Sequence, residues 1–91
     1  MKYVIVYDIV DDKRRCHVVR ILLGVCYRVQ KSVFEGFLSS DELTNITAKL
    51  TKVIDSKEDS VRFYPLCEAC NKKIDLIGVG IMIEKIEYII V

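Results

Sequence analysis

The chain has 91 residues, of which 52% are hydrophobic and 30% charged, and its formal net charge is +1 at pH 7. This length predicts a single domain spanning residues 1–91, and the composition excludes a disordered tail. No apolar run reaches the ~20 residues of a membrane span, because Glu84 and Lys85 interrupt the apolar C-terminus. The first residues also lack the pattern of a signal peptide. We therefore expect a cytoplasmic protein that does not enter membranes.

The first predicted element is a strand over residues 2–9 that is rich in Val, Ile and Tyr and carries one carboxylate. Alternate side chains are apolar on both faces, so we expect a central strand that is covered on both sides. Asp8 then lies at the C-terminal end of the strand, next to a loop. An unpaired buried carboxylate costs several kcal/mol, so Asp8 must be solvated, paired or bound to a cation.

Two amphipathic helices follow from the periodicity of the apolar residues. The first is expected over residues 13–24, with Asp11 or Asp12 as its N-cap. Ser39 and Glu42 have the spacing of a capping box and predict the start of the second helix. The apolar stripe of the first helix is Cys16, Val19, Leu22 and Leu23, and that of the second is Leu43, Ile46, Leu50, Val53 and Ile54.

The remaining apolar segments predict strands. Pro65 indicates that the far end of the strand that contains it is an edge of the sheet or an exit from it. The segment "CEACNKK", which begins at Cys67, indicates one short turn of helix. The expected strands are residues 27–38, as two strands that turn near 30–32, then 60–66, 74–77 and the extended segment 81–91.

This order of elements predicts an α+β fold, a ferredoxin-like βαββαβ sandwich with a C-terminal strand extension. Both helices would cover one face of a four-stranded antiparallel sheet. The other face is left without cover, although the first strand is apolar there too. We therefore expect a homodimer in which two sheets pack face to face, with residues 81–91 at the interface.

Asp8 is the candidate catalytic and metal-binding residue. Across a two-fold axis, the Asp8 side chains of two copies would share a proton or bind a hard cation such as Mg²⁺ or Mn²⁺. Water on such an ion can hydrolyse a phosphodiester bond. The simpler interpretation is that Asp8 pairs with a local arginine or caps the following turn. The residues alone leave both interpretations open.

Basic residues gather in the first half of the chain and suggest a surface for nucleic-acid phosphates, although a solvated surface is the simpler interpretation. His17, the single histidine, suits a surface or phosphate contact and has no nucleophile arranged beside it. The aromatic residues are better interpreted as core or interface residues than as a base-stacking platform, and base stacking is left open only for Phe34, which lies within the basic stretch. The residues concerned are Tyr7, Tyr27, Phe34 and Tyr64. The basic residues concerned are Lys13, Arg14, Arg15, Arg20, Arg28 and Lys31.

The four cysteines provide a single CxxC motif, Cys67 with Cys70. A structural zinc site needs a second such pair or two histidines, so a local disulfide or two half-buried thiols is the better interpretation. Cys16 and Cys26 are expected to pack in the core. A metal-handling protein that holds zinc or copper at the CxxC motif remains as a further hypothesis.

Three segments together resemble the small CRISPR-associated endoribonuclease family, the ferredoxin-like partner of the integrase in spacer acquisition. They are "YVIVYDIVDDKRR", "RVQKSVFEGFLS" and "DSVRFYPLC", in the order and spacing of that family. The resemblance implies a homodimer with a divalent metal between the two copies of Asp8. Tyr7 and Asp8 match the family's YD pair, and Arg15 matches its helix arginine. Arg28 and Phe34 match positions of the RVQ-x-SVFE motif, whereas His17 stands where the family often has a second arginine.

Two functions of different classes follow from the resemblance. One is a Mg²⁺-dependent (or Mn²⁺-dependent) endonuclease that cleaves single-stranded RNA or double-stranded DNA with Asp8. In it, the phosphates would be held by Lys13, Arg14, Arg15 and Arg28, with Tyr7 and Phe34 in support. The alternative is a non-catalytic dimeric adaptor that bridges integrase dimers and contacts the backbone of duplex DNA.

Overall fold

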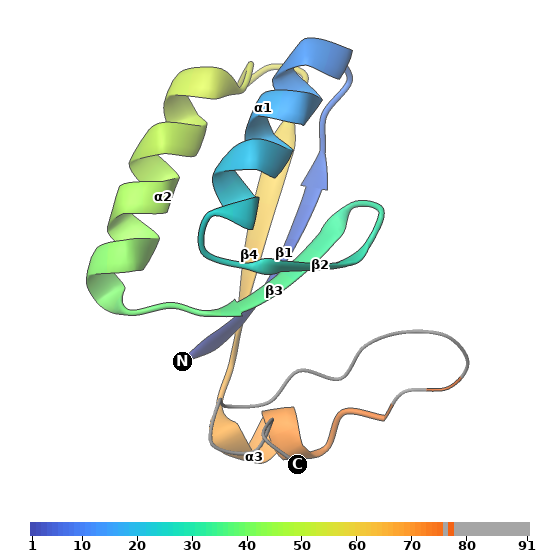
Figure 1. The fold of residues 1–91 in the computed structure, drawn as a ribbon, viewed down its shortest axis with the longest axis vertical. Coiled ribbons are helices and arrows are strands. Elements are labelled where there is room, and N and C mark those ends of the chain that lie inside the picture. The colour runs from blue at the N-terminus through green and yellow to red at the C-terminus, as the bar shows by residue number, and fades with distance from the viewer. Residues whose placement is uncertain (76, 78–91) are drawn as a thin grey trace.

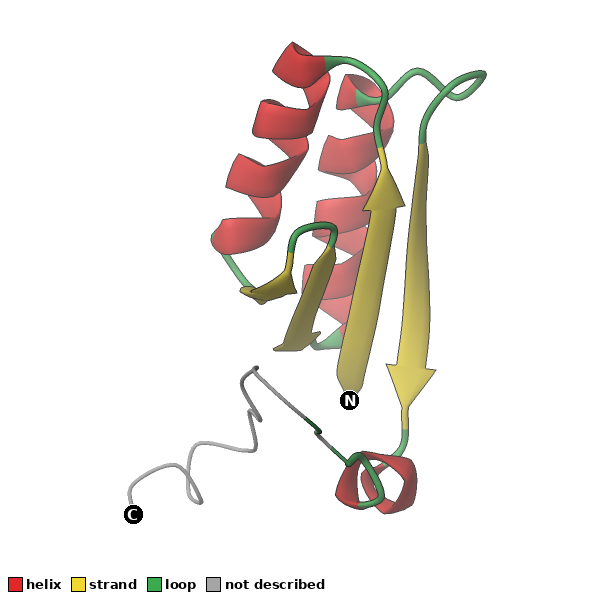
Figure 2. Cartoon of the chain, turned by 90° about the vertical axis from the view of Figure 1, so that its right-hand side faces the viewer, coloured by secondary structure: helices red, strands yellow, loops and turns green. Residues whose placement is uncertain are grey.

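A computed structural model describes residues 1–75 and 77 of the chain. The elements are β1 (Lys2–Asp8), α1 (Asp12–Leu23), β2 (Tyr27–Gln30), β3 (Val33–Phe37), α2 (Ser40–Val53), β4 (Ser60–Leu66) and α3 (Glu68–Lys72). In these residues the strands form one antiparallel sheet in the order β2-β3-β1-β4. Helices α1 and α2 both lie on one face of that sheet (Figures 1 and 2), which confirms the predicted ferredoxin-like α+β arrangement.

The core lies between the helices and the sheet. Ile5 of β1 faces the helices at the centre of the sheet, and its register partners are Phe34 on β3 and Phe63 on β4. Phe34 is 0% exposed and is one of the largest fully buried side chains. The buried apolar residues around it are Ile5, Tyr7, Ile9, Val18, Leu22, Cys26, Leu38, Ile46 and Leu50.

Both predicted N-caps are confirmed. The side chain of Asp11 accepts a hydrogen bond from the backbone N–H of Arg14, so α1 begins at Asp12. Ser39 and Glu42 form the reciprocal capping box at the start of α2. The hydrogen bonds from Ser39 also lower the pKa of the Glu42 carboxyl.

The predicted apolar face of α1 is wrong in part. Cys16 and Leu23 are exposed, and the helix instead buries Val18 and Leu22, which lie one turn apart. Apolar residues occupy more than one side of this helix, so periodicity alone did not fix the face that packs on the sheet. The predicted burial of Cys26 is confirmed. Burial raises the pKa of its thiol to about 11, and the thiol lies so close to Gly36 that a Cβ there would come within 2.9 Å of it.

The strand predictions are confirmed for β1 to β4, with one correction. The edge position of β4 agrees with the prediction from Pro65, and β1 is central in the sheet as predicted. In the described part of the chain, α1 and α2 cover only one face of β1, also as predicted, and Val4 and Val6 on the open face are half-buried. The cover of that open face by a second copy stays a prediction. Residues 74, 75 and 77 are not in a strand, so the predicted fifth strand is wrong there. The predicted segment 81–91 lies outside the described residues.

Candidate active site at the end of β1

Asp8 is the last residue of β1 and is exposed. Alternation along the strand places its side chain on the open face of the sheet, opposite Ser60 on β4. Within residues 1–75 and 77 its carboxylate makes no hydrogen bond or ion pair. The pairing with a local arginine or turn, the simpler of the two interpretations, is therefore not what the described residues show. The turn is capped by Asp11 instead.

The three residues that follow Asp8 are each held by a specific hydrogen bond. The carbonyl of Ile9 accepts from Nη2 of Arg15 at 3.1 Å, and the N–H of Val10 donates to Oδ1 of Asp59 at 3.2 Å. Asp11 accepts from the N–H of Arg14 at 2.9 Å. The backbone that carries Asp8 into α1 is thus fixed by groups from α1 and from the loop before β4.

Arg14 is engaged inside the chain. Its Nε donates to Oδ2 of Asp59 at 2.7 Å, and its Nη2 lies 3.3 Å from both Oδ1 of Asp59 and Oε2 of Glu58. The Asp59 side chain is 0% exposed. The hydrogen bond from Arg14 lowers the pKa of the Asp59 carboxyl to about 2, helped by the N–H groups of Asp55 and Val10. The contact of Arg14 with nucleic acid stays a prediction.

Arg28 is anchored by the hairpin between β2 and β3. Its Nη2 donates to the carbonyl of Lys31 at 2.9 Å and to the hydroxyl of Tyr7 at 3.2 Å. The Tyr7 hydroxyl itself donates to the same Lys31 carbonyl at 2.8 Å. The guanidinium carbon lies 5.8 Å from the centroid of the Phe34 ring. Phe34 is fully buried, which confirms the interpretation as a core residue and rules out the base stacking that was left open for it.

The structure brings three of the candidate residues together and separates a fourth from them. Tyr7, Arg28 and Phe34 form one contact group. Asp8 follows Tyr7 directly in the strand, so its side chain projects to the opposite face of the sheet. Lys13 is exposed and makes no ion pair within the described residues. These basic residues therefore surround the end of β1 without forming a single pocket with Asp8.

One chain supplies only part of a metal site. No group of three or more His, Cys, Asp or Glu side chains in residues 1–75 and 77 is placed to hold a metal ion. Mg²⁺ is commonly held by one or two carboxylates while it keeps several waters. An exposed carboxylate without a partner in the described part of the chain therefore fits such an ion if a second copy supplies the other carboxylate.

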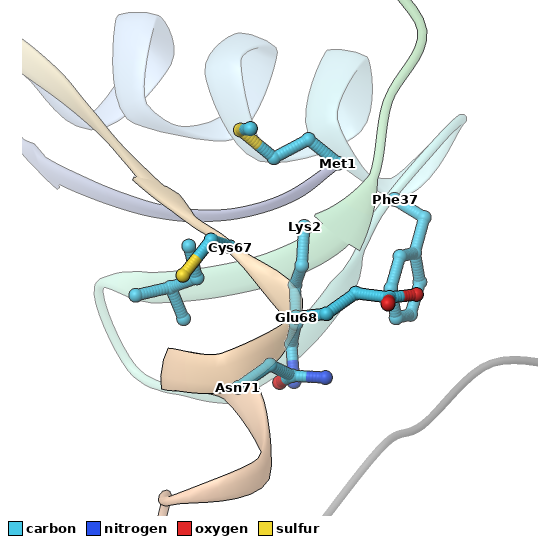
Figure 3. Close-up of a pocket in the computed structure, with 7 residues that line it drawn as sticks. Met1, Lys2, Phe37, Cys67, Glu68 and Asn71 are labelled. Carbon is cyan, nitrogen blue, oxygen red and sulfur yellow. The ribbon is translucent and has the colours of Figure 1, made fainter.

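The hollow at the other end of β1 is separate from Asp8. It has a volume of about 220 Å³ and is bounded by the start of β1, the end of β3 and α3 (Figure 3). Lys2 contributes to it and pairs with Glu35 at 2.9 Å. Lys2 and Asp8 are six residues apart in one strand, roughly 20 Å at 3.3 Å per residue. The hollow therefore takes no part in the chemistry of Asp8.

The cysteines of the CxxC motif differ from the prediction. Cys67 and Cys70 are exposed, not half-buried, and both are free thiols. Cys67 is the N-cap of α3, where its Sγ accepts from the N–H of Cys70 at 3.4 Å. That hydrogen bond lowers the pKa of the Cys67 thiol.

The model of the family described as CRISPR associated protein Cas2 matches residues 1–74. The chain belongs to the Cas2 family. It is 45% identical over 76 residues to CRISPR-associated endoribonuclease Cas2 3 of Synechocystis, covering 84% of this chain and 83% of that protein. A Chloroflexus aurantiacus protein of the same name is 42% identical over 78 residues, covering 86% of this chain and 84% of that protein. The crystal structure of Streptococcus pyogenes Cas2 superposes with a TM-score of 0.76 at 34% identity, covering 86% of this chain and 100% of that one.

The Cas2-family chain holds the backbone beside Asp8 through Asp59, a buried residue that was not among the predicted site residues. Asp59 lies in the segment "DSKEDS" before β4, where it is one of four charged residues, so nothing in its own segment distinguishes it. Its position directly before the strand that begins at Ser60 was the only local signal. Buried carboxylates need donors, and the arginines of "DDKRR" are the donors nearest in the motif.

Proposed function

We propose that this Cas2-family protein acts in CRISPR spacer acquisition as a homodimeric, divalent-metal-dependent endonuclease in the cytoplasm. The observation that supports the proposal is the exposed carboxylate of Asp8, which ends a rigidly paired central strand without a partner on the described chain. No helix among the described residues is long and apolar enough to cross a membrane.

Each chain contributes a defined set of groups to the proposed reaction. The Asp8 carboxylates of two copies would hold Mg²⁺ or Mn²⁺, which when bound supplies an activated water for phosphodiester hydrolysis. Arg28 presents a guanidinium whose position is fixed by Tyr7 and Lys31. Arg15 and Lys13 lie at the start of α1 and would bind neighbouring phosphates.

The open face of the sheet supports the proposed homodimer. Val4, Val6 and Val33 are half-buried there, and Tyr64 is 46% exposed. Packing the two faces together about a two-fold axis that runs along β1 would bring the two Asp8 side chains to the same side of the interface, as a shared ion requires. Light scattering at micromolar concentration is expected to give the mass of a dimer, and the mass of a monomer would contradict the proposal.

The deciding experiment measures cleavage of labelled single-stranded RNA and double-stranded DNA. Wild type and Asp8→Asn are compared across a pH series, with Mg²⁺ and with chelator. We expect cleavage that requires both the metal and Asp8, with a loss of at least 100-fold in the variant because its amide cannot supply the anionic ligand. Equal cleavage by the variant, or no cleavage by wild type, would leave Asp8 without a catalytic role.

One observation favours the adaptor as a second candidate. A shallow hollow along α1 is lined by Asp12, Lys13, Cys16, His17 and Arg20. Lys13 and Arg20 make no ion pair within the described residues, so their charge is available to a DNA backbone in a complex with the integrase.

The adaptor is tested by the salt dependence of duplex DNA binding. Each phosphate contact that is lost should reduce the slope of log K against log salt concentration by ~0.9. We expect this reduction for Lys13→Gln and for Arg28→Gln, and no change for Lys49→Gln on the far helix. If the slope is unchanged in Lys13→Gln and Arg28→Gln, these residues do not contact DNA phosphates and the basic surface is only solvated.

A further inference from the structure

Asp59 lies at the centre of a polar network that joins three segments of the chain. Its Oδ1 accepts from the Val10 N–H and from Nη2 of Arg14, and its Oδ2 accepts from Nε of Arg14 and the Asp55 N–H. The four distances run from 2.7 to 3.3 Å. All these donors reach a side chain that is fully buried, so both oxygens are satisfied.

The network is adjacent to the proposed active site without touching it. Asp59 precedes Ser60, which pairs with Asp8 across β1 and β4. Val10, two residues after Asp8, is held through its N–H although its own side chain is 59% exposed. The Asp59 carboxylate is therefore one of the groups that fix where the chain leaves β1, together with Arg15, which holds the carbonyl of Ile9.

Arg14 belongs to this network and not to the basic surface that would bind phosphates. Two of its nitrogens donate to one carboxylate, the geometry in which arginine binds most strongly. To bind a phosphate it would have to leave Asp59 as a buried, partly unpaired anion, which is strongly unfavourable. Arg14 thus differs from Arg15, whose ion pair is with the exposed Asp12, and from Lys13, which makes no ion pair within the described residues.

We propose that Asp59 is a positioning residue for Asp8, acting through Val10 and Arg14, and that Arg14 belongs to this support instead of contacting nucleic acid. The inference rests on the proposed function, because it assumes that Asp8 binds a divalent ion. Groups that orient metal ligands typically change metal affinity by 10- to 100-fold when they are removed. Asp59 acts at one remove from the ligand, so we expect the lower end, about tenfold.

The test uses Mn²⁺ as the probe and measures its dissociation constant by electron paramagnetic resonance, with hydrogen exchange of the Val10 amide measured by NMR. Asp59→Asn, which can accept only at one oxygen, should weaken Mn²⁺ binding about tenfold and speed Val10 exchange. Arg14→Gln should do the same, while its duplex DNA salt slope stays that of wild type. Glu58→Gln removes a carboxylate from the same guanidinium but leaves Val10 held, and should match wild type.

A stability control separates positioning from general loosening. Leu50→Val lowers stability in the core without touching the loop after β1, so it should keep wild-type Mn²⁺ affinity. All variants are compared below their melting temperatures. If Asp59→Asn and Arg14→Gln bind Mn²⁺ as wild type does, or if Leu50→Val weakens binding equally, Asp59 does not position Asp8. A salt slope reduced by ~0.9 in Arg14→Gln would overturn the assignment of Arg14.

Failure of the proposed function gives a different pattern. In that case Asp8→Asn and wild type would bind Mn²⁺ equally weakly, and the positioning role would fall with the metal site. If Asp8→Asn alone loses binding, the metal site stands and only the role of Asp59 is rejected. In either case, the salt dependence of DNA binding by Arg14→Gln tests separately whether Arg14 contacts nucleic acid.

Discussion

The two ends of β1 both carry a charge, and the chain treats them in opposite ways. Lys2 is 4% exposed, and it pairs with Glu35, itself 17% exposed, and lies 5.9 Å from the Phe37 ring centroid. Asp8 is exposed and has no side-chain partner within the described residues. One charge is thus satisfied by the fold itself, while the other is left available to a ligand or a second copy.

The open end is nevertheless well supported by the chain. The backbone after Asp8 is held by Arg15, Asp59 and Asp11, so the polar groups around the carboxylate are satisfied while the carboxylate is not. At Lys2 the fold itself pairs the charge, whereas at Asp8 it holds the backbone and leaves the carboxylate exposed. The metal binding proposed above would use that exposed carboxylate.

The largest expected effect is at the Lys2 end. Lys2→Met keeps most of the side-chain volume but leaves the half-buried Glu35 carboxylate unpaired, so we expect a loss of about 3 kcal/mol in the free energy of unfolding. Urea denaturation measures it. Lys49→Met, at an exposed position on α2, should change stability by less than about 0.5 kcal/mol.

A double variant sharpens the same comparison. Lys2→Met with Glu35→Gln removes both charges, so part of the loss in the single variant should be recovered. If Lys2→Met alone is as stable as wild type, the Lys2–Glu35 ion pair contributes nothing to stability. The Lys2 end of β1 would then not be the stabilising end of the strand.

A smaller loss of stability is expected at low pH, where the Asp59 carboxylate that holds the backbone after Asp8 becomes protonated. The Asp59 pKa is lowered to about 2 in the folded chain, chiefly by Arg14, from an ordinary value near 3.8. A lowered pKa gives stability that is fully present above about pH 4 and is lost as the pH falls toward 2. Wild type should therefore melt at a higher temperature than Asp59→Asn at pH 6, and this difference should close between pH 4 and 2. A difference that stays constant down to pH 2 would contradict the ion pair.

The sequence was sufficient for the fold because its local signals agree with one another. The caps at Asp11 and Ser39, the alternation in β1 and the edge signal of Pro65 all indicated the arrangement that is observed. Where two faces of an element were equally apolar, as in α1, the choice depended on contacts with the sheet. Cys16 was misplaced for that reason.

The candidate site was predicted less completely than the fold. Asp8 stood out because a carboxylate interrupts an apolar strand, and the exposed position observed for it explains how the strand tolerates it. The difference between Arg14 and Arg15 could not be read from the run "DDKRR", because Arg14 pairs with Asp59, 45 residues further along the chain, whereas Arg15 contacts its near neighbours. Base stacking was left open for Phe34 because its neighbours in sequence are basic, whereas its neighbours in space are apolar.

The smallest expected effect, on stability, is at Asp8 itself. Asp8→Asn removes a charge that no described group on the chain pairs with, so the free energy of unfolding should change by less than about 0.5 kcal/mol. Urea denaturation with chelator present measures the chain without bound metal. A loss above about 1 kcal/mol would show that Asp8 is part of the structural framework, as Lys2 is. A stable variant that has lost Mn²⁺ binding would instead confirm that this end of β1 is kept open for a ligand.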